Sequence, residues 1–175
     1  MADIRGLDPQ GHPRDVGVTN DGSVLVTSRA YQTRRIVVPG IGASSAYASG
    51  DAFGAKFTFS VPAEGTIATV MFIDRDDEGL AKELVLFNDD FAATTDNSAF
   101  AVSDNDLLLC RGVIPITTFF DFGNNQIGIA TPAMSYNLND QNSNAGLRTF
   151  YCQLVTRGVD NIAAGSEPVI YMVIV

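Results

Sequence analysis

The stretch KFTFSVPAEGTIATVMFID, residues 56–74, determines the fold class of this chain. In its first part Phe57, Phe59 and Val61 alternate with polar residues, which is the period of a strand with one buried face. Its second part, residues 65–74, is β-branched and apolar on both faces, which is typical of a central strand. A proline between the two parts ends the first strand. The stretch therefore predicts two strands, one half-buried and one central.

Other segments with strand patterns follow at short intervals along the chain. Residues 83–88 come after the acidic turn DRDDEG, residues 74–79, and we expect them to form a hairpin or meander with the preceding strand. A short helix is predicted where Ser103 precedes Asp106 at capping-box spacing. Further strands are predicted at residues 112–122, 125–134, 147–158 and 167–175. No stretch has sustained helical periodicity, so we predict an all-β sandwich or jelly-roll-like domain of about seven to nine strands.

The first 34 residues differ in composition from the rest of the chain. They are rich in Gly, Asp, Thr and Arg, and contain one short candidate strand, SVLVT at residues 23–27, after a turn signal. We therefore expect residues 1–34 to form an N-terminal arm or linker and residues 35–175 to form the β-sandwich domain. Both a disordered terminus and an arm that becomes ordered against a partner fit this composition.

The formal net charge of −9 is concentrated in the middle of the chain. Residues 63–110 contain eleven acidic and two basic residues, whereas the charges on either side cancel. A phosphate backbone would be repelled by this region, and no basic stripe with interleaved aromatic residues exists elsewhere, so nucleic-acid binding is disfavoured.

No apolar run approaches the roughly 20 residues that span a bilayer, and the start of the chain has no signal-peptide pattern. We expect synthesis and folding in a cytoplasm, without membrane association.

The cysteines and the acidic turn are the candidate metal ligands of this chain. Cys110 and Cys152 each lie in or beside an apolar segment, and a reducing cytoplasm favours two buried free thiols over a disulfide. Neither cysteine has a ligand at zinc spacing, and the single histidine, His12, is far away in sequence. The turn at residues 74–79 resembles the first half of a calcium loop, but Val85 stands where a bidentate Glu is needed. We predict no metal site and interpret the turn as a solvated hairpin tip.

The stretch FNDDFAATTDNSAFAVSDND, residues 87–106, holds five aspartates and raises the question of catalysis. Asp89 and Asp90 are adjacent on an extended chain, so their side chains point in opposite directions and do not converge on one bond. Four other side chains are expected to hydrogen-bond nearby backbone in turns: Asp96, Asn97, Asp104 and Asn105. The chain has neither a nucleophile elbow nor a phosphate-binding glycine loop. We therefore predict no catalytic residue, no cofactor and no enzymatic activity.

Several separated segments resemble one set of proteins. These are ASSAYASGDAFG at residues 43–54, ATVMFIDRDDEGLAKELVLFNDDFAATTDNSAFAVSDND at 68–106, LCRGVIPI at 109–116 and LRTFYCQLVTRGV at 147–159. In this order they resemble small structural proteins encoded in tailed-bacteriophage genomes. The resemblance covers about residues 43–159, and the C-terminal segment VDNIAAGSEPVIYMVIV departs from it.

This resemblance implies a virion component with an all-β fold and no activity of its own. Of the possible places in the particle we favour the capsid exterior, where the chain would be a capsid decoration, or cement, protein. It would bind the major capsid protein as a homo-oligomer, for which we predict a trimer. A low charge fraction suits extensive contacts between subunits. The arm's docking element is predicted to comprise Arg29, Arg34, Arg35, Ile36, Val37 and Val38.

Two alternatives remain open from the sequence. A tail, baseplate or head-fibre component would use the same fold with different neighbours and a different copy number. A β-sandwich that binds host glycans is the other alternative, with Tyr47, Phe91 and Tyr136 as the aromatic residues available to stack on a sugar. The absence of tryptophan from the chain weighs against the second.

Overall fold

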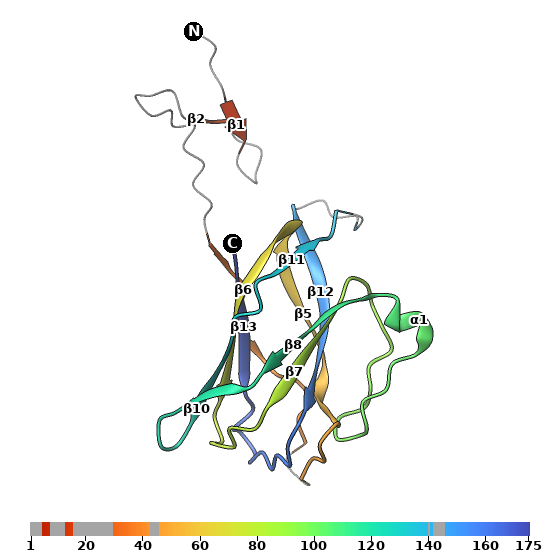
Figure 1. Ribbon diagram of the computed structural model, residues 1–175, viewed down its shortest axis with the longest axis vertical. Helices are drawn as coiled ribbons and strands as arrows, with labels where there is room; N and C mark the ends of the chain where they lie inside the picture. Colours follow the sequence, from red (N-terminus) through yellow and green to blue (C-terminus); the bar gives the residue numbers. More distant parts are fainter. Residues whose placement is uncertain (1–4, 8–12, 16–29, 43–45, 140, 142–145) are drawn as a thin grey trace.

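The computed structural model describes the backbone of residues 5–7 and 13–15, and residues 30–42, 46–139, 141 and 146–175 in full. From residue 30 onward the described chain is an all-β sandwich, in which two antiparallel sheets pack against each other (Figure 1). The predicted fold class is confirmed. Within the first 34 residues, β1 (Arg5–Leu7) and β2 (Pro13–Asp15) pair with each other, and the predicted strand at residues 23–27 lies outside the described residues.

The first sheet is built around β6 (Glu64–Asp74). On one side β6 pairs with β13 (Val169–Ile174), and beyond β13 lie the short strands β3 (Tyr31–Gln32) and β4 (Ile36–Val37). On the other side β6 pairs with β10 (Gln126–Ala130), which pairs with β9 (Thr118–Asp121), and further along with β11 (Met134–Asn137). The stretch that is apolar on both faces is therefore a central strand, as predicted.

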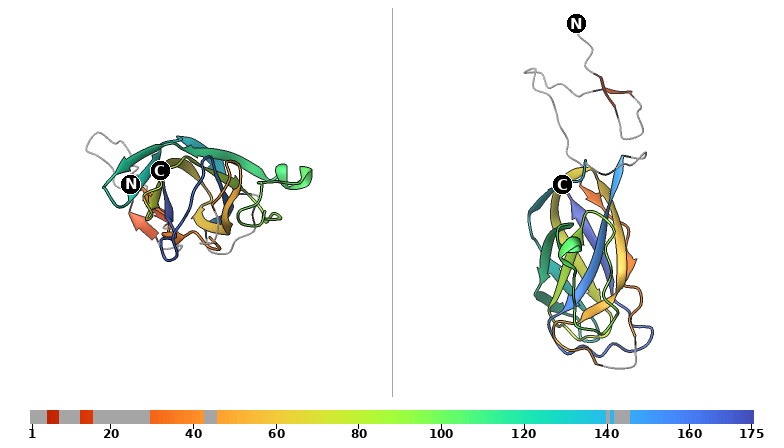
Figure 2. Two further views of the ribbon diagram at one scale, coloured as in Figure 1. Left: turned by 90° about the horizontal axis from the view of Figure 1, so that it is seen from below. Right: turned by 90° about the vertical axis from the view of Figure 1, so that its right-hand side faces the viewer.

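The second sheet has four strands in the order β5 (Ala52–Pro62), β12 (Leu147–Thr156), β7 (Lys82–Phe87) and β8 (Cys110–Ile116). On β5 the alternation is as predicted, since Phe57, Phe59 and Val61 are buried and Thr58 and Ser60 are exposed. The short helix α1 (Asp104–Leu107) begins as predicted, because the hydroxyl of Ser103 accepts a hydrogen bond from the backbone N–H of Asp106. It lies on the outer side of the second sheet (Figure 2).

The main core fills the space between the two sheets. Buried aromatic and aliphatic side chains from both sheets meet there, including Phe53, Phe72, Leu84 and Phe150. Cys152 belongs to this core, and burial raises the pKa of its thiol well above the ordinary value. Both cysteines are free thiols. The prediction of two buried thiols is correct for Cys152 and wrong for Cys110, which is only half-buried because it begins the edge strand β8.

The connection between β6 and β7 corrects one prediction. The two strands do not form a hairpin or meander, because β6 belongs to the first sheet and β7 to the second. The carboxylate of Asp74 accepts hydrogen bonds from the backbone N–H groups of Asp76 (3.0 Å) and Gly79 (2.8 Å), and Asp74 is buried. The acidic turn is therefore a folded crossover between the sheets and not a solvated hairpin tip.

The strands in the described part of residues 30–175 number eleven, more than predicted. The predicted strand at residues 112–122 divides at Thr117 into β8 in the second sheet and β9 in the first, so the chain changes sheets there. The predicted strand at 125–134 divides into β10 and the start of β11, with Ala133 at a positive φ of 48° between them. The first division occurs because one continuous apolar segment serves two sheets, whereas β10 and β11 both pair with β6 in the first sheet.

The start of the sandwich lies a few residues before the predicted boundary at residue 35. β3 pairs with β13, and Thr33 is buried between strands. The Thr33 backbone N–H donates to the carbonyl of Met172, and its hydroxyl accepts from the Met172 N–H, both at 2.9 Å. Residues 31–33 therefore belong to the sandwich.

Candidate interaction surface

The outer face of the first sheet, which points away from the core, carries a row of apolar side chains that crosses five strands. The strand register aligns Val37 of β4 with Val169 of β13, Val169 with Ile73 of β6, Ile73 with Ile127 of β10, and Ile127 with Phe120 of β9. Each is directly opposite the next, where neighbouring side chains lie close enough to pack. The row ends in Val37 and Phe120, which are 54% and 51% exposed.

A second row lies beside the first on the same face. Tyr171 of β13 is opposite Met71 of β6, and Met71 is opposite Ile129 of β10. All three are half-buried, whereas the alternate residues on these strands are buried in the core. We call the two rows together the apolar face; its members are Val37, Met71, Ile73, Phe120, Ile127, Ile129, Val169 and Tyr171.

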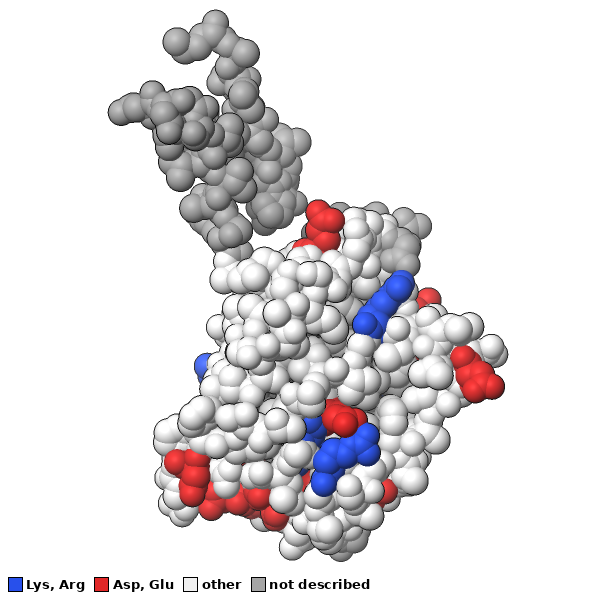
Figure 3. Space-filling model, viewed as in Figure 1, with Lys and Arg blue, Asp and Glu red and all other residues white. Residues whose placement is uncertain are grey.

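The apolar face is nearly free of charge. None of its members is charged, and the guanidinium of Arg35 lies over the Tyr171 ring, 5.3 Å from its centre. Polar side chains begin at one end of the sheet, where Thr66 is hydrogen-bonded to Ser135 at 3.1 Å. In the view of Figure 3 acidic atoms gather at the lower end of the domain, and much of the remaining surface is neither acidic nor basic. A neutral region on a chain of net charge −9 is suited to contact another macromolecule.

The structure divides the predicted docking element. Val38 is fully buried, with its N–H donating to the carbonyl of Pro168, and Ile36 packs against the core, so these two side chains stabilise the sandwich. Val37 is a member of the apolar face, and Arg35 is exposed beside it, over the Tyr171 ring. Arg34 is also exposed, but it lines a pocket with Tyr31 and with Ser60 of β5, between the edges of the two sheets. Arg29 lies outside the described residues.

The outer face of the second sheet is covered by the chain itself. The connection between β7 and β8, residues 88–109, lies over it and forms a second, smaller core. The ring of Phe91 stacks on that of Phe87, with 4.0 Å between ring centres, and Val85 and Val155 are buried beside them. The ammonium of Lys56 donates to the Phe91 carbonyl at 2.8 Å. The aspartate-rich stretch is therefore a structural cover and not a convergent carboxylate site.

Two polar side chains fasten this cover. The carboxylate of Asp96 accepts hydrogen bonds from the N–H groups of Gly42 (2.9 Å) and Gly54 (2.7 Å) and from the hydroxyl of Tyr47 (2.8 Å). The buried amide of Gln153 on β12 bonds to both backbone groups of Thr94. The predicted role of Asp96, bonding to nearby backbone, is wrong: its partners are 42 to 54 residues away.

The aromatic residues offered for glycan stacking are not available as a platform. Tyr47 and Phe91 are 1% and 4% exposed. Tyr136 is half-buried and packs edge-to-face on Phe150, with 5.0 Å between ring centres. A sugar ring needs an exposed aromatic face, so these three side chains do not provide one.

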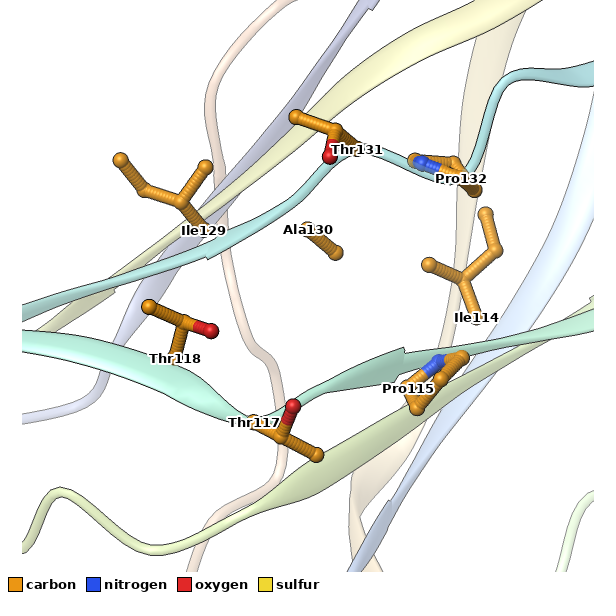
Figure 4. A pocket seen from close by; sticks show the side chains of 8 residues that line it. All are labelled: Ile114, Pro115, Thr117, Thr118, Ile129, Ala130, Thr131 and Pro132. Atoms are coloured by element: carbon orange, nitrogen blue, oxygen red, sulfur yellow. The ribbon is translucent and has the colours of Figure 1, made fainter.

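An open pocket of about 260 Å³ lies where β8 and β10 separate. Figure 4 shows three threonine hydroxyls pointing into it, from Thr117, Thr118 and Thr131. Two prolines and aliphatic side chains complete the lining, and it contains no titratable group. Such a lining offers neither a nucleophile with a base nor a charged anchor for a ligand.

Two carboxylates of the acidic turn are bonded to the protein itself. The side chains of Asp76 and Glu78 accept hydrogen bonds from the N–H groups of Ala163 and Asn161 in the connection after β12. Within the described ranges no group of three or more His, Cys, Asp or Glu side chains is placed to hold a metal ion. In the same ranges no helix is long and apolar enough to cross a membrane.

Comparison of the chain with known protein families, with curated proteins and with solved structures finds no match. The apolar face is a candidate interaction surface that was not predicted from the sequence. The signal for it was present in residues 65–74, whose two faces are both apolar. A central strand that is buried on both faces would have the same pattern. The register of the neighbouring strands is therefore needed to show that one apolar face is left uncovered.

Proposed function

We propose that this protein is a structural component of a tailed-bacteriophage particle, namely a capsid decoration protein that binds the major capsid protein on the outside of the shell. The observation that carries the proposal is the apolar face. With strands about 4.8 Å apart and residues on one face about 6.6 Å apart along a strand, its eight members cover roughly 250 Å² of the sheet. Contiguous apolar patches larger than a few hundred Å² are rare on monomeric proteins and often mark interaction sites, and the apolar face approaches that size.

The proposed contact combines the apolar face with the basic edge beside it. Burial of the face would supply the apolar centre of an interface, while Arg35 would pair with a carboxylate of the capsid protein at its rim. β3 and β4 lie at the edge of the same sheet, and β3 pairs with the end of β13, the strand that contributes Val169 and Tyr171 to the face. In this proposal the arm and the apolar face form one continuous contact.

The mechanism we propose is stapling of neighbouring capsid subunits. Trimers would sit where capsomers meet, and each copy would bury an interface of standard size. Contacts that are individually weak would act together because the arm and the domain are tethered in one chain. The shell would then resist the outward pressure of packaged DNA without any chemical step by the decoration protein.

The copy number of the protein in purified particles tests its place in the virion. Quantitative mass spectrometry against the major capsid protein is expected to give a ratio near one, which is the ratio of a shell-wide decoration. A ratio of a few per hundred would place the protein at the tail, a fibre or a vertex and would overturn the proposal.

Removal of residues 1–29 tests the contribution of the arm. The deletion stops before Tyr31 and Thr33 because these residues are bonded to β13. The shortened protein is expected to keep the circular dichroism and urea unfolding midpoint of the sandwich but to lose most of its occupancy on particles. Full occupancy by the shortened protein would remove the arm from the mechanism.

A further inference from the structure

A lysine and an aspartate are buried in contact at the end of the main core. Lys82 begins β7 and Asp160 lies in the connection after β12; their side chains are each 1% exposed. The Lys82 Nζ lies 2.7 Å from the Asp160 Oδ1. The carboxyl carbon is one covalent bond beyond that oxygen, so the amine is close to the distance of about 3–3.5 Å at which reacting atoms are poised.

The surroundings of the pair hold both groups in place and exclude water. The Phe53 and Phe72 rings face Nζ, with 4.9 Å and 5.7 Å between Nζ and the ring centres. The hydroxyl of Thr156 donates to the second carboxylate oxygen of Asp160, and Nζ also donates to the carbonyl of Leu80 at 2.7 Å. The Lys82 nitrogen and both carboxylate oxygens of Asp160 are therefore each held by a hydrogen bond.

We propose that Lys82 and Asp160 are the site of an intramolecular isopeptide bond. The amine nitrogen of Lys82 attacks the carboxyl carbon of Asp160, a C–N bond forms, and one carboxyl oxygen leaves. From an ammonium and a carboxylate the products are one neutral amide and one water molecule, so atoms and charges balance and no oxidant or other reactant is needed.

Burial favours this condensation in two ways. Two charges removed from water are costly to keep, and a neutral amide in their place removes that cost. Condensation of a separate amine and acid is opposed in water, but groups held in a reactive arrangement behave as if at an effective concentration of about 10⁵ M or more. The same pair at the surface would have neither advantage.

The protonation of the site supports the step. An amine must be neutral to attack, and burial lowers the pKa of the Lys82 ammonium. Burial also raises the pKa of Glu78, whose charge interacts with that of Asp160, so a carboxyl able to carry a proton lies close to the pair. Glu78 is half-buried, and its carboxylate accepts a hydrogen bond from the N–H of Asn161, the residue after Asp160.

The chain contains an internal control for the chemistry. Its only other lysine, Lys56, forms an ion pair with Asp90 in which the side chains are 29% and 63% exposed. Water surrounds that pair, and no aromatic pair encloses it on both sides. We therefore expect Lys56 to remain an ordinary lysine.

Mass spectrometry of the full-length protein, denatured after purification, tests the proposal. The expected intact mass is lower than the sequence mass by one water molecule. Digestion with a protease that cuts after lysine is expected to cut after Lys56 and not after Lys82, and fragment spectra should join the peptides that contain Lys82 and Asp160.

The variant Asp160→Ala is the matched test of the linkage, and it is read on denatured protein so that its folding does not matter. It is expected to restore both the ordinary mass and cleavage after Lys82. A wild-type protein of full sequence mass would overturn the proposal. So would a protein that has lost water but is still cut after Lys82, because the water would then have been lost elsewhere, as in a succinimide.

Discussion

The two sheets of this sandwich differ in what covers their outer faces. The second sheet carries the connection of residues 88–109, which buries Val85, Phe87 and Val155 beneath Phe91. The first sheet carries equally apolar side chains on its outer face, including Ile73 and Ile127, and none of the described residues forms a second core over them. The chain thus supplies its own cover for one sheet, and we assign the other to a partner.

The difference shows which apolar side chains stabilise the isolated domain. A side chain under the cover is removed from water on folding, which contributes about 25 cal/mol per Å² of apolar surface buried. A side chain on the apolar face is only partly removed from water on folding, and it would be removed further only if a partner covered the face, as we propose. Substitutions on the two faces should therefore affect different measurements.

The largest expected effect is on the covered sheet, from Phe91→Ala. Loss of the buried ring that stacks on Phe87 should reduce the free energy of unfolding by about 3–5 kcal/mol, as measured by urea denaturation. Phe122, which is 63% exposed, provides the control, because Phe122→Ala should change the free energy of unfolding by less than about 0.5 kcal/mol. Equal effects of the two variants would mean that residues 88–109 do not form a cover.

A smaller loss is expected from Asp96→Ala, which removes the polar fastening of the cover. Three donors, on Gly42, Gly54 and Tyr47, would lose their acceptor, and the expected cost is about 2 kcal/mol. Asp104→Ala, at an exposed position in the first turn of α1, is the matched control. The two variants should be compared in one thermal unfolding series, and similar midpoints would contradict the role of Asp96.

The same chemical change on each outer face compares the two directly. Val85→Thr places a hydroxyl under the cover and should cost about 1–2 kcal/mol. Val173→Thr places it on the outer side of β13 and should cost less than about 0.5 kcal/mol. If Val173→Thr proved the more destabilising in urea, the first sheet would have to be covered in the isolated protein.

The smallest expected effect concerns alkaline pH. Burial raises the pKa of Tyr47, whose hydroxyl donates to Asp96, and of Tyr136, which packs on Phe150. The unfolded chain loses these protons near pH 10 while the folded chain keeps them, so stability is lost as pH rises above about 10. Tyrosinate absorbance from two of the five tyrosines should therefore appear only as the circular dichroism of the sheets disappears. Titration of all five in the native protein would contradict this.

The strands could be predicted from the sequence because their signal is local. Alternation at Phe57, Phe59 and Val61 and the capping pattern at Ser103 each depend on a few neighbouring residues, and both predictions were correct. The assignment of strands to sheets could not be predicted in the same way. Whether β6 continues into a hairpin or crosses to the other sheet depends on how Asp74 is bonded in the folded turn.

The proposed interaction surface was less accessible to sequence reasoning than the fold. The apolar face exists only because strands from residues 36–37, 64–74, 118–130 and 169–174 are aligned in register. The fastening of the cover depends on Asp96 meeting partners far away in sequence, and the buried pair joins Lys82 to a residue 78 positions later. Such pairings are fixed by the tertiary structure and leave no local pattern.

The most direct test of the proposed docking surface is to add the purified Ile73→Lys variant to phage particles that lack this protein, and to measure how much of it binds. Ile73 lies at the centre of the apolar face, and Val113→Lys on β8 provides a control at another exposed apolar position. If the face is buried against the capsid, the Ile73→Lys variant should keep its fold but bind particles at least about tenfold more weakly, which is a loss of about 1.4 kcal/mol in binding free energy. The Val113→Lys variant should bind as the wild type does. Wild-type binding by a folded Ile73→Lys variant would contradict the assignment of the apolar face as the docking surface.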